Sequence, residues 1–215
     1  MKKILIVAAT QKEVEYLIDL PQNINNQEIE RIDFLITGIG IVNTIHNLTD
    51  LLKDVEYNLV INIGICGAYN RELELGQVVE VIEDCFADQL VETGSQELKW
   101  FEAGFNSNTV FPYTENGKLL PSHSISLSEL NKVKSITSDT VHASEQSISK
   151  ISQLFAPDIE TMEGAAVFYV CRKMNIDVIQ IRSISNYVEI RNKKEWKIEM
   201  AIENLTPFVK TILLK

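Results

Sequence analysis

The chain has 215 residues, of which 45% are hydrophobic and 23% are charged, as is ordinary for a globular protein. These proportions exclude a disordered, collagen-like or coiled-coil chain. The net charge is −10 and no basic patch stands out in the sequence, so we expect no binding to nucleic acid or to an anionic membrane surface. The length fits a single α/β domain over residues 1–215.

Cysteine and histidine are few and scattered: the chain contains Cys66, Cys85, Cys171, His46, His123 and His142. The cysteines are odd in number and have apolar neighbours, which indicates reduced, buried thiols. None of these residues follows a metal-binding spacing, so we predict no metal and no cofactor. The apolar run near the start, residues 4–9, is too short for a signal-peptide core or a membrane span. We therefore expect a cytoplasmic protein.

The predicted elements alternate between strand and helix. The first is a strand over Lys3–Ala9, whose unbroken aliphatic run is typical of a strand buried on both faces. Val14, Leu17 and Ile18 then have helical spacing, and Pro21 is expected to end that helix. Further strands are predicted over 34–36, 59–63, 77–82, 133–137 and 178–184, and further helices over 41–52, 164–174 and 196–214.

This alternation predicts an α/β fold, a single domain with three layers, α/β/α, around a central mixed, mostly parallel sheet. In such sheets ligands bind at the carboxyl ends of the strands. The alternation breaks over 86–132, a segment rich in Asn, Ser, Gly, Thr and aromatic residues. Three interpretations of this segment stay open: a lid, a subunit interface and a satellite hydrophobic cluster.

Two glycine-containing segments follow predicted strands, Gly38-Ile39-Gly40 and Gly64-Ile65-Cys66-Gly67-Ala68. We interpret both as turns at the carboxyl edge of the sheet, where the backbone approaches a ligand closely. Close packing of a helix on a strand explains each of them equally well. The first segment does not fit a dinucleotide-binding fingerprint, because residue 43 is Asn instead of Gly.

Three polar residues stand near the same edge, and each has a structural and a functional explanation. Glu13 is placed to act as a general base, but Thr10 and Glu13 also match a capping box. Glu163 begins a helix, where the dipole favours a carboxylate, and its two oxygens also suit the paired hydroxyls of a ribose. Asn186 offers donors and an acceptor to a ligand, or it simply ends a strand in a turn. Spacing alone favours the structural explanation for both acids.

Together and in this order, the segments resemble the nucleoside phosphorylase and nucleosidase superfamily over essentially the whole chain. Gln11-Lys12-Glu13-Val14 and the two glycine segments are similar to methylthioadenosine/S-adenosylhomocysteine nucleosidases, in which the Glu at the position of Glu13 activates water. Thr161-Met162-Glu163-Gly164-Ala165 resembles that family's ribose motif. The resemblance implies that Met162 packs on the sugar and that Glu163 binds its 2′ and 3′ hydroxyls. It also implies substrate contacts at Gly64, Ile65 and Cys66.

The segment from Arg182 to Glu189, with Arg191, Asn192 and Trp196 after it, most resembles the futalosine hydrolases of menaquinone biosynthesis. Asn186 stands where the methylthioadenosine enzymes have Asp. The resemblance implies hydrolysis of the N-glycosidic bond of futalosine with release of hypoxanthine, with Glu13 and Asn186 as catalytic residues. It also implies a place for His142 at the far end of the substrate, and a homodimer.

Three alternatives remain beside this expectation. One is a nucleosidase acting on methylthioadenosine, S-adenosylhomocysteine or aminodeoxyfutalosine. The second is a purine nucleoside phosphorylase, which is disfavoured because Glu13 and Asn62 stand in the regions where such enzymes carry phosphate-binding Arg. The third is a nucleoside-binding protein without catalysis, which retention of Glu13, Glu163 and Asn186 together argues against.

Overall fold

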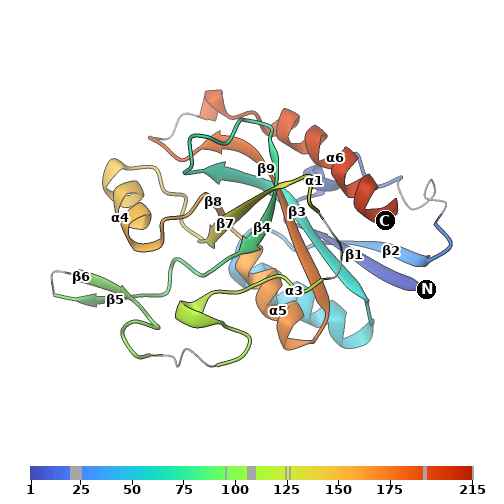
Figure 1. Ribbon diagram of the computed structural model, residues 1–215, viewed down its shortest axis with the longest axis horizontal. Coiled ribbons are helices and arrows are strands. Elements are labelled where there is room, and N and C mark those ends of the chain that lie inside the picture. The colour runs from blue at the N-terminus through green and yellow to red at the C-terminus, as the bar shows by residue number, and fades with distance from the viewer. Residues whose placement is uncertain are drawn as a thin grey trace.

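The computed structural model describes residues 1–19, 26–94, 96–105, 110–123, 125, 127–190 and 193–214. The helices are α1 (Gln11–Val14), α3 (Ile41–Asp54), α4 (Glu145–Phe155), α5 (Gly164–Lys173) and α6 (Ile198–Leu214), and short 3-10 helices cover Glu115–Gly117 and Lys193–Glu195. The strands are β1 (Lys2–Ala8), β2 (Ile29–Ile36), β3 (Leu59–Ala68), β4 (Val78–Glu83), β5 (Leu90–Thr93), β6 (Gln96–Lys99), β7 (Asn131–Thr137), β8 (Ile159–Thr161) and β9 (Asp177–Tyr187). Figure 1 shows their arrangement.

Seven strands form one sheet in the order β2-β1-β3-β8-β7-β4-β9, and β9 also pairs with β3. Strands β3, β8, β7, β4 and β9 therefore form a closed barrel. The sequence pattern did not indicate this closure. Among the described pairings of this sheet, β3–β8 and β4–β9 are antiparallel and the others are parallel. The predicted mixed, mostly parallel sheet is confirmed.

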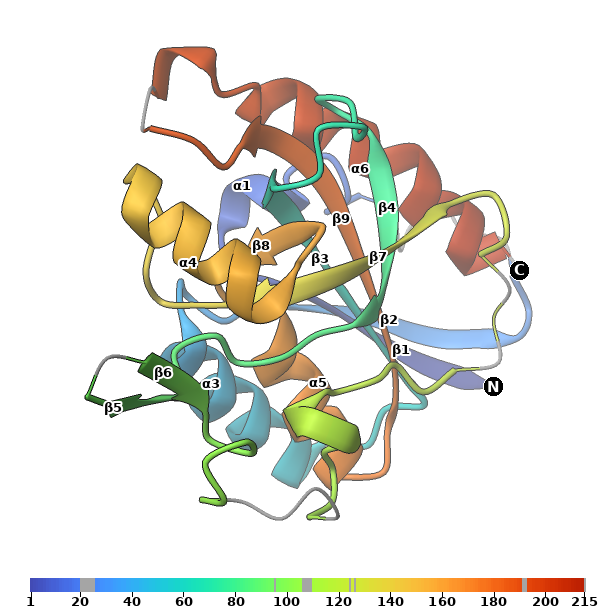
Figure 2. The ribbon, with the colours of Figure 1, turned by 60° about the vertical axis from the view of Figure 1, so that its left-hand side comes forward.

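Helices cover both faces of the sheet, with α3 and α5 on one side and α1 and α6 on the other (Figure 2). Strand β1 contributes side chains to the hydrophobic cores on both faces of the sheet. Its Leu5 and Val7 pack in the core beneath α3 and α5, whereas Ile4 and Ile6 pack in the core beneath α1 and α6. All four side chains are buried. The unbroken aliphatic run thus marks a strand covered on both faces, and the three-layer α/β prediction holds.

The first helix is shorter than predicted. α1 ends at Val14, and residues 15–19 form turns. Val14 and Leu17 are buried against the sheet, but Ile18 is exposed, so no continuous apolar face exists to hold a longer helix on the core. Pro21, expected to end that helix, lies outside the described residues. Within the described part of the chain, no helix is long and apolar enough to cross a membrane.

The second glycine segment is a strand and not a turn. β3 continues through Gly64 to Ala68, and β9 continues through Asn186 to Tyr187. The two strands pair with each other beyond the predicted ends, and β8 adds a further pairing at Gly67 and Ala68. Because these pairings satisfy the backbone hydrogen bonds, the chain stays extended where its glycines suggested a turn.

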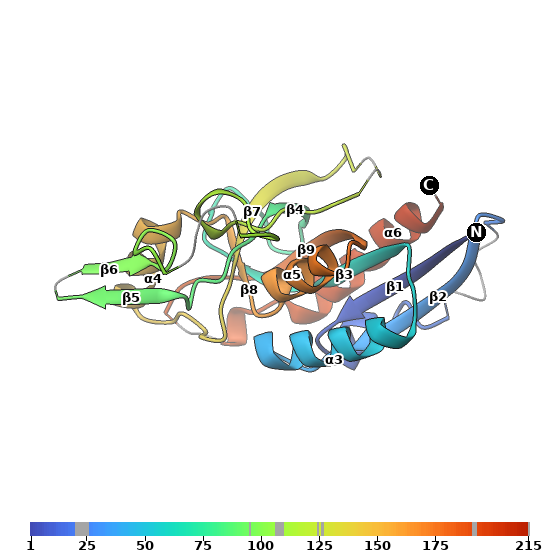
Figure 3. The same ribbon diagram turned by 90° about the horizontal axis from the view of Figure 1, so that it is seen from below.

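The segment 86–132 is more ordered than predicted. It contains the β5–β6 hairpin, which extends away from the main sheet (Figure 3), and a 3-10 helix. The rings of Phe101 and Tyr113 lie 5.1 Å apart, and Tyr113 lies 5.7 Å from Tyr169 of α5. These ring contacts favour the interpretation of the segment as a satellite hydrophobic cluster over its interpretation as a lid or as a subunit interface. Phe105 and Phe111 are exposed.

Candidate active site

A cavity of about 360 Å³ opens at the carboxyl ends of the strands. Its walls come from the ends of β3, β8 and β9, from the loops after β1, β2, β7 and β8, from α1, and from the start of α6 with Trp196 before it. It lies at the edge where the alternation of elements predicted a ligand site. Of the eight site residues named from the sequence, six line it: Glu13, Ile65, Cys66, Met162, Glu163 and Asn186. None of its described lining residues comes from the segment 86–132.

Glu13 makes the capping-box contacts that its spacing predicted, and it also faces the cavity. Its Oε2 accepts hydrogen bonds from the Thr10 backbone N–H at 2.9 Å and from the Thr10 hydroxyl at 3.0 Å. Its Oε1 accepts from the backbone N–H of Ile65 at 3.1 Å. The carboxylate is almost fully buried and still lines the cavity, so the cap fixes its orientation and one lone pair of Oε1 is left for a ligand.

Glu163 does not cap its own helix. The first N–H groups of α5 are bound by hydroxyls instead, since Gly164 N–H donates to Thr161 Oγ1 and Ala165 N–H donates to Thr137 Oγ1. Glu163 Oε1 accepts from the backbone N–H of Gly40 at 2.9 Å, across from the first glycine segment. Its second oxygen is therefore available to a ligand in the cavity.

Burial raises the pKa of the Glu163 carboxyl, and the neighbouring Glu13 and Asp139 charges raise it further. The guanidinium of Arg182 and the Gly40 hydrogen bond act in the opposite direction. Two carboxylates thus face one cavity, and the buried Arg182 cation favours the ionised form of Glu163.

Arg182 begins the segment that resembles the futalosine hydrolases, but the sequence assigned it no role, and the structure shows it as a buried cation. It lies in β9 with 1% of its surface exposed, and its Nε and Nη2 have no hydrogen-bond partner among the described residues. Its Nη1 and Glu13 Oε1 approach Gly64 so closely that any side chain there would collide with both. Gly64 does not line the cavity; it makes room for these two groups. The signal in the sequence was a charge within an otherwise apolar buried strand.

A β-bulge orients Asn186. Cys66 pairs with Ile184 but Gly67 pairs with Asn186, so one extra residue, Ser185, is inserted in β9 beside the cavity. Asn186 Nδ2 donates to the carbonyl of Tyr187 at 3.0 Å, which fixes the orientation of the amide, and Oδ1 lies 2.7 Å from the Ser185 hydroxyl. The amide keeps one N–H donor and one lone pair for a ligand.

His142 lies beside the cavity instead of in its wall. It lines a small adjoining pocket, together with Glu160 and Asn186. His142 Nδ1 is 2.8 Å from Glu160 Oε2, which also accepts from the Tyr69 hydroxyl at 3.1 Å. Glu160 itself lines both the small pocket and the main cavity. The strand that carries it, β8, has only three residues, and sequence patterns did not reveal it.

Burial disfavours the thiolate form of Cys66 in the site. Burial raises the pKa of the Cys66 thiol to about 12, so it stays protonated at neutral pH. No group of three or more His, Cys, Asp and Glu side chains in the described part of the chain is placed to hold a metal ion. Arg191 and Asn192, part of the resemblance above, fall outside the described residues.

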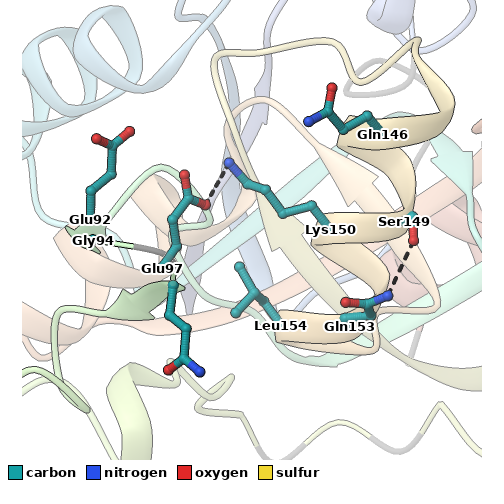
Figure 4. A pocket seen from close by; sticks show the side chains of 9 residues that line it. Glu92, Gly94, Glu97, Gln146, Ser149, Lys150, Gln153 and Leu154 are labelled. Atoms are coloured by element: carbon teal, nitrogen blue, oxygen red, sulfur yellow. Dashed lines mark hydrogen bonds and ion pairs between the residues drawn. The ribbon is translucent and has the colours of Figure 1, made fainter.

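A second and larger hollow, of about 680 Å³, lies between the β5–β6 hairpin and α4. Figure 4 shows Lys150 reaching from α4 to Glu97 of the hairpin, with 2.6 Å between Nζ and Oε2, and Gln153 bonded to Ser149 along the helix. Its walls are mainly long polar side chains, away from the strand ends. The smaller cavity, with its buried carboxylates, has the features of a ligand site.

The fold and the carboxylate-lined cavity at the strand ends define an α/β protein built to bind a small ligand. The chain belongs to the phosphorylase superfamily, whose family model matches residues 3–213. Within that superfamily it groups with nucleosidases, which hydrolyse N-glycosidic bonds.

Two curated relatives illustrate this grouping. A 5′-methylthioadenosine/S-adenosylhomocysteine nucleosidase of Buchnera aphidicola is 27% identical, with 94% of this chain and 86% of the relative covered. A futalosine hydrolase of Thermus thermophilus is 24% identical, with 84% of this chain and 80% of the relative covered.

Solved structures show the same fold. A 5′-methylthioadenosine/S-adenosylhomocysteine nucleosidase of Neisseria meningitidis superposes with a TM-score of 0.81 at 19% identity, covering 100% of this chain and 99% of that one. A futalosine hydrolase of Helicobacter pylori superposes with a TM-score of 0.79 at 17% identity, covering 99% and 97%.

Proposed function

We propose that the chain is a futalosine hydrolase, which cleaves the N-glycosidic bond of futalosine and releases hypoxanthine and dehypoxanthine futalosine. The observation that carries the proposal is the pair of buried carboxylates, Glu13 and Glu163, that face one cavity with Asn186. The match to the phosphorylase superfamily and the names of the relatives support nucleoside chemistry. Asn186 is the feature that favours futalosine within that class.

Hydrolysis of a nucleoside passes through a cation-like ribosyl group, so the site must deliver water to C1′ and support the departing base. Glu13 accepts the proton of the attacking water through the free lone pair of Oε1. Glu163 binds the 2′ and 3′ hydroxyls of the ribose through the oxygen that Gly40 does not occupy. Met162, in the cavity wall, packs on the sugar. Ile65 and Cys66 contact the substrate from β3.

The electrostatics of the cavity support water over phosphate as the nucleophile. Lys12 is the one basic residue among the described lining residues, and it is paired with Glu199 of α6. Glu13 and Glu163 would repel a phosphate anion placed at C1′. Arg182 lies behind Gly64 and not in the lining.

Asn186 selects the base in this proposal. Its amide oxygen accepts from a protonated N7 of hypoxanthine, and its free N–H donates to O6. Adenine presents an amine at position 6, which would face the amide donor. Relatives named as methylthioadenosine/S-adenosylhomocysteine nucleosidases make adenine release the second candidate function.

The experiment measures kcat/KM for futalosine, its 6-amino analogue and methylthioadenosine, with and without phosphate. We expect futalosine to be cleaved orders of magnitude faster than the other two, with free sugar as product under both conditions, and Asn186→Asp to narrow or reverse the preference. Preferred cleavage of the adenine nucleosides would replace the proposal by the second candidate. A ribose 1-phosphate product would identify a phosphorylase, and absence of any turnover would identify a binding protein.

A further inference from the structure

A third acidic side chain, Glu160 of β8, faces the cavity beside Asn186. Glu160 and Asn186 both pair with Gly67 of β3, one on each side, so the three residues form one row across the sheet. A Cβ at Gly67 would lie 2.9 Å from Val188 Cγ2, 3.2 Å from Asn186 Nδ2 and 3.5 Å from Glu160 Cγ. The side chains of Glu160 and Asn186 therefore stand on the same face, which lines the cavity.

The Glu160 carboxylate is held through one oxygen only. His142 Nδ1 lies 2.8 Å from Oε2, and the Tyr69 hydroxyl donates to the same atom at 3.1 Å. Oε1 has no partner among the described residues, and 13% of the side chain is exposed. Burial and the nearby Glu160 charge raise the pKa of Tyr69, so its hydroxyl keeps its proton and remains a donor. Glu160 thus presents a fixed, free acceptor to the cavity.

We propose that Glu160 makes the site specific for 6-oxopurines by accepting the N1–H of the base. The proposal rests on the proposed function and adds a second residue that contacts the purine. Along the edge of hypoxanthine the groups follow in the order N7, O6 and N1–H. Asn186 meets the first two, and Glu160, next in the row, meets the third.

Adenine does not fit this row. Its unprotonated N1 carries a lone pair, which would face the lone pairs of a carboxylate whose partners are fixed. A 6-oxopurine instead forms a charge-assisted hydrogen bond with the same oxygen. Because mismatched buried polar groups are costly, the contact discriminates between the two classes of base. In this arrangement His142 acts through Glu160 and does not touch the substrate.

Glu160→Gln tests the proposal, because it removes the charged acceptor that N1–H would meet. With the amide oxygen bonded to the Tyr69 hydroxyl and to an Nδ1–H tautomer of His142, the NH₂ group faces the cavity, where it repels N1–H and suits N1 of adenine. With the amide turned round, only a neutral and weaker acceptor faces the cavity. We expect the ratio of kcat/KM for futalosine over its 6-amino analogue to fall at least about tenfold. Glu72→Gln, which makes the same change at an exposed position outside the cavity lining, is the matched control and should keep the preference for the 6-oxopurine.

Two further measurements separate specificity from folding and from catalysis. The parent protein should cleave N1-methylated futalosine at least about tenfold less efficiently than futalosine, which requires no variant to fold. Calorimetric titration should show tighter binding of hypoxanthine than of adenine by the parent, and a weaker preference in the Gln variant. An unchanged ratio in the folded variant, or equal cleavage of the N1-methylated substrate, would overturn the proposal. If the parent cleaves no nucleoside, the proposed function fails, and the titration still tests Glu160.

Discussion

In this site a carboxylate that makes structural hydrogen bonds also faces the cavity. Glu13 is both the acid of a capping box and a lining residue of the cavity, because its two oxygens bind different partners. Glu163 stands at a helix start, yet Thr161 and Thr137 bind the helix N–H groups in its place. Structural hydrogen bonds thus orient each carboxylate without using all of its lone pairs.

Glu13→Gln should remove most of the hydrolysis. An amide fills the same space but does not accept the proton of the attacking water, and loss of a general base costs roughly 10² to 10⁴ in rate. The measurement is kcat with futalosine, accompanied by a thermal melt to verify folding. Glu15→Gln is the control, since Glu15 is exposed two residues away. A kcat near that of the parent would leave Glu13 with the capping role alone.

The elements show which parts of the fold a sequence determines. Strands buried on both faces, such as β1, appear as unbroken aliphatic runs and were predicted. β8 has three residues and no periodicity, and its pairing with β3 and β7 depends on distant chain segments. α4 was missed although Ser144 caps it, because Ile151 is its one fully buried residue. Glu160 was accordingly not predicted to line the cavity, and Arg182 received no role although its strand was predicted correctly.

The start of α5 rests on a buried polar network. Asp84 accepts hydrogen bonds from the Thr137 hydroxyl at 3.0 Å and from Gln180 Nε2 at 3.1 Å. Thr137 in turn binds the backbone N–H of Ala165, two residues after Glu163. A side chain at Gly164 would collide with Asp84 and Gln180. The network therefore fixes the position of the helix that presents Glu163 to the cavity.

Asp84 should make stability depend on pH. The pKa of the Asp84 carboxyl is raised from 3.8 to about 6, and burial is the largest cause of this shift. The folded chain then binds more protons than the unfolded chain between about pH 4 and 6, so this group's contribution to stability falls as pH rises through that window. Ionisation of this buried carboxyl lowers the free energy of unfolding at pH 7 by on the order of 3 kcal/mol.

The free energy of unfolding of the Asp84→Asn variant should therefore increase relative to that of the parent protein as pH rises from 4 to 7. Gln180 can turn its amide to meet the new NH₂ group, since its Oε1 has no partner among the described residues. Denaturant unfolding of both proteins across this range gives the difference, in which other titrating groups cancel. Asp54→Asn, at an exposed position, is the control. A difference that does not vary with pH would contradict the assigned role of Asp84.

On the surface of the molecule, exposed apolar side chains lie beside the mouth of the cavity. Val42 is 75% exposed, Ile39 is 56% exposed and Val141 is 41% exposed. Ile39 and Val141 also line the cavity. The backbone N–H of Ile41 donates to Asp139 Oδ1, which ties the two segments together. Clustered exposed apolar residues next to a functional site are typical of a protein interface.

We predict that the chain forms a homodimer through this surface, in line with the resemblance noted from the sequence. With a net charge of −10 on each copy, two chains repel each other, so added salt should strengthen the association by screening that repulsion while the apolar contact persists. Sedimentation velocity at several protein and salt concentrations measures both effects. Val42→Lys should shift the equilibrium toward the monomer, whereas Ile18→Lys, which alters an exposed residue on the opposite layer, should not. A monomer at all concentrations, or equal effects of the two substitutions, would refute this interface.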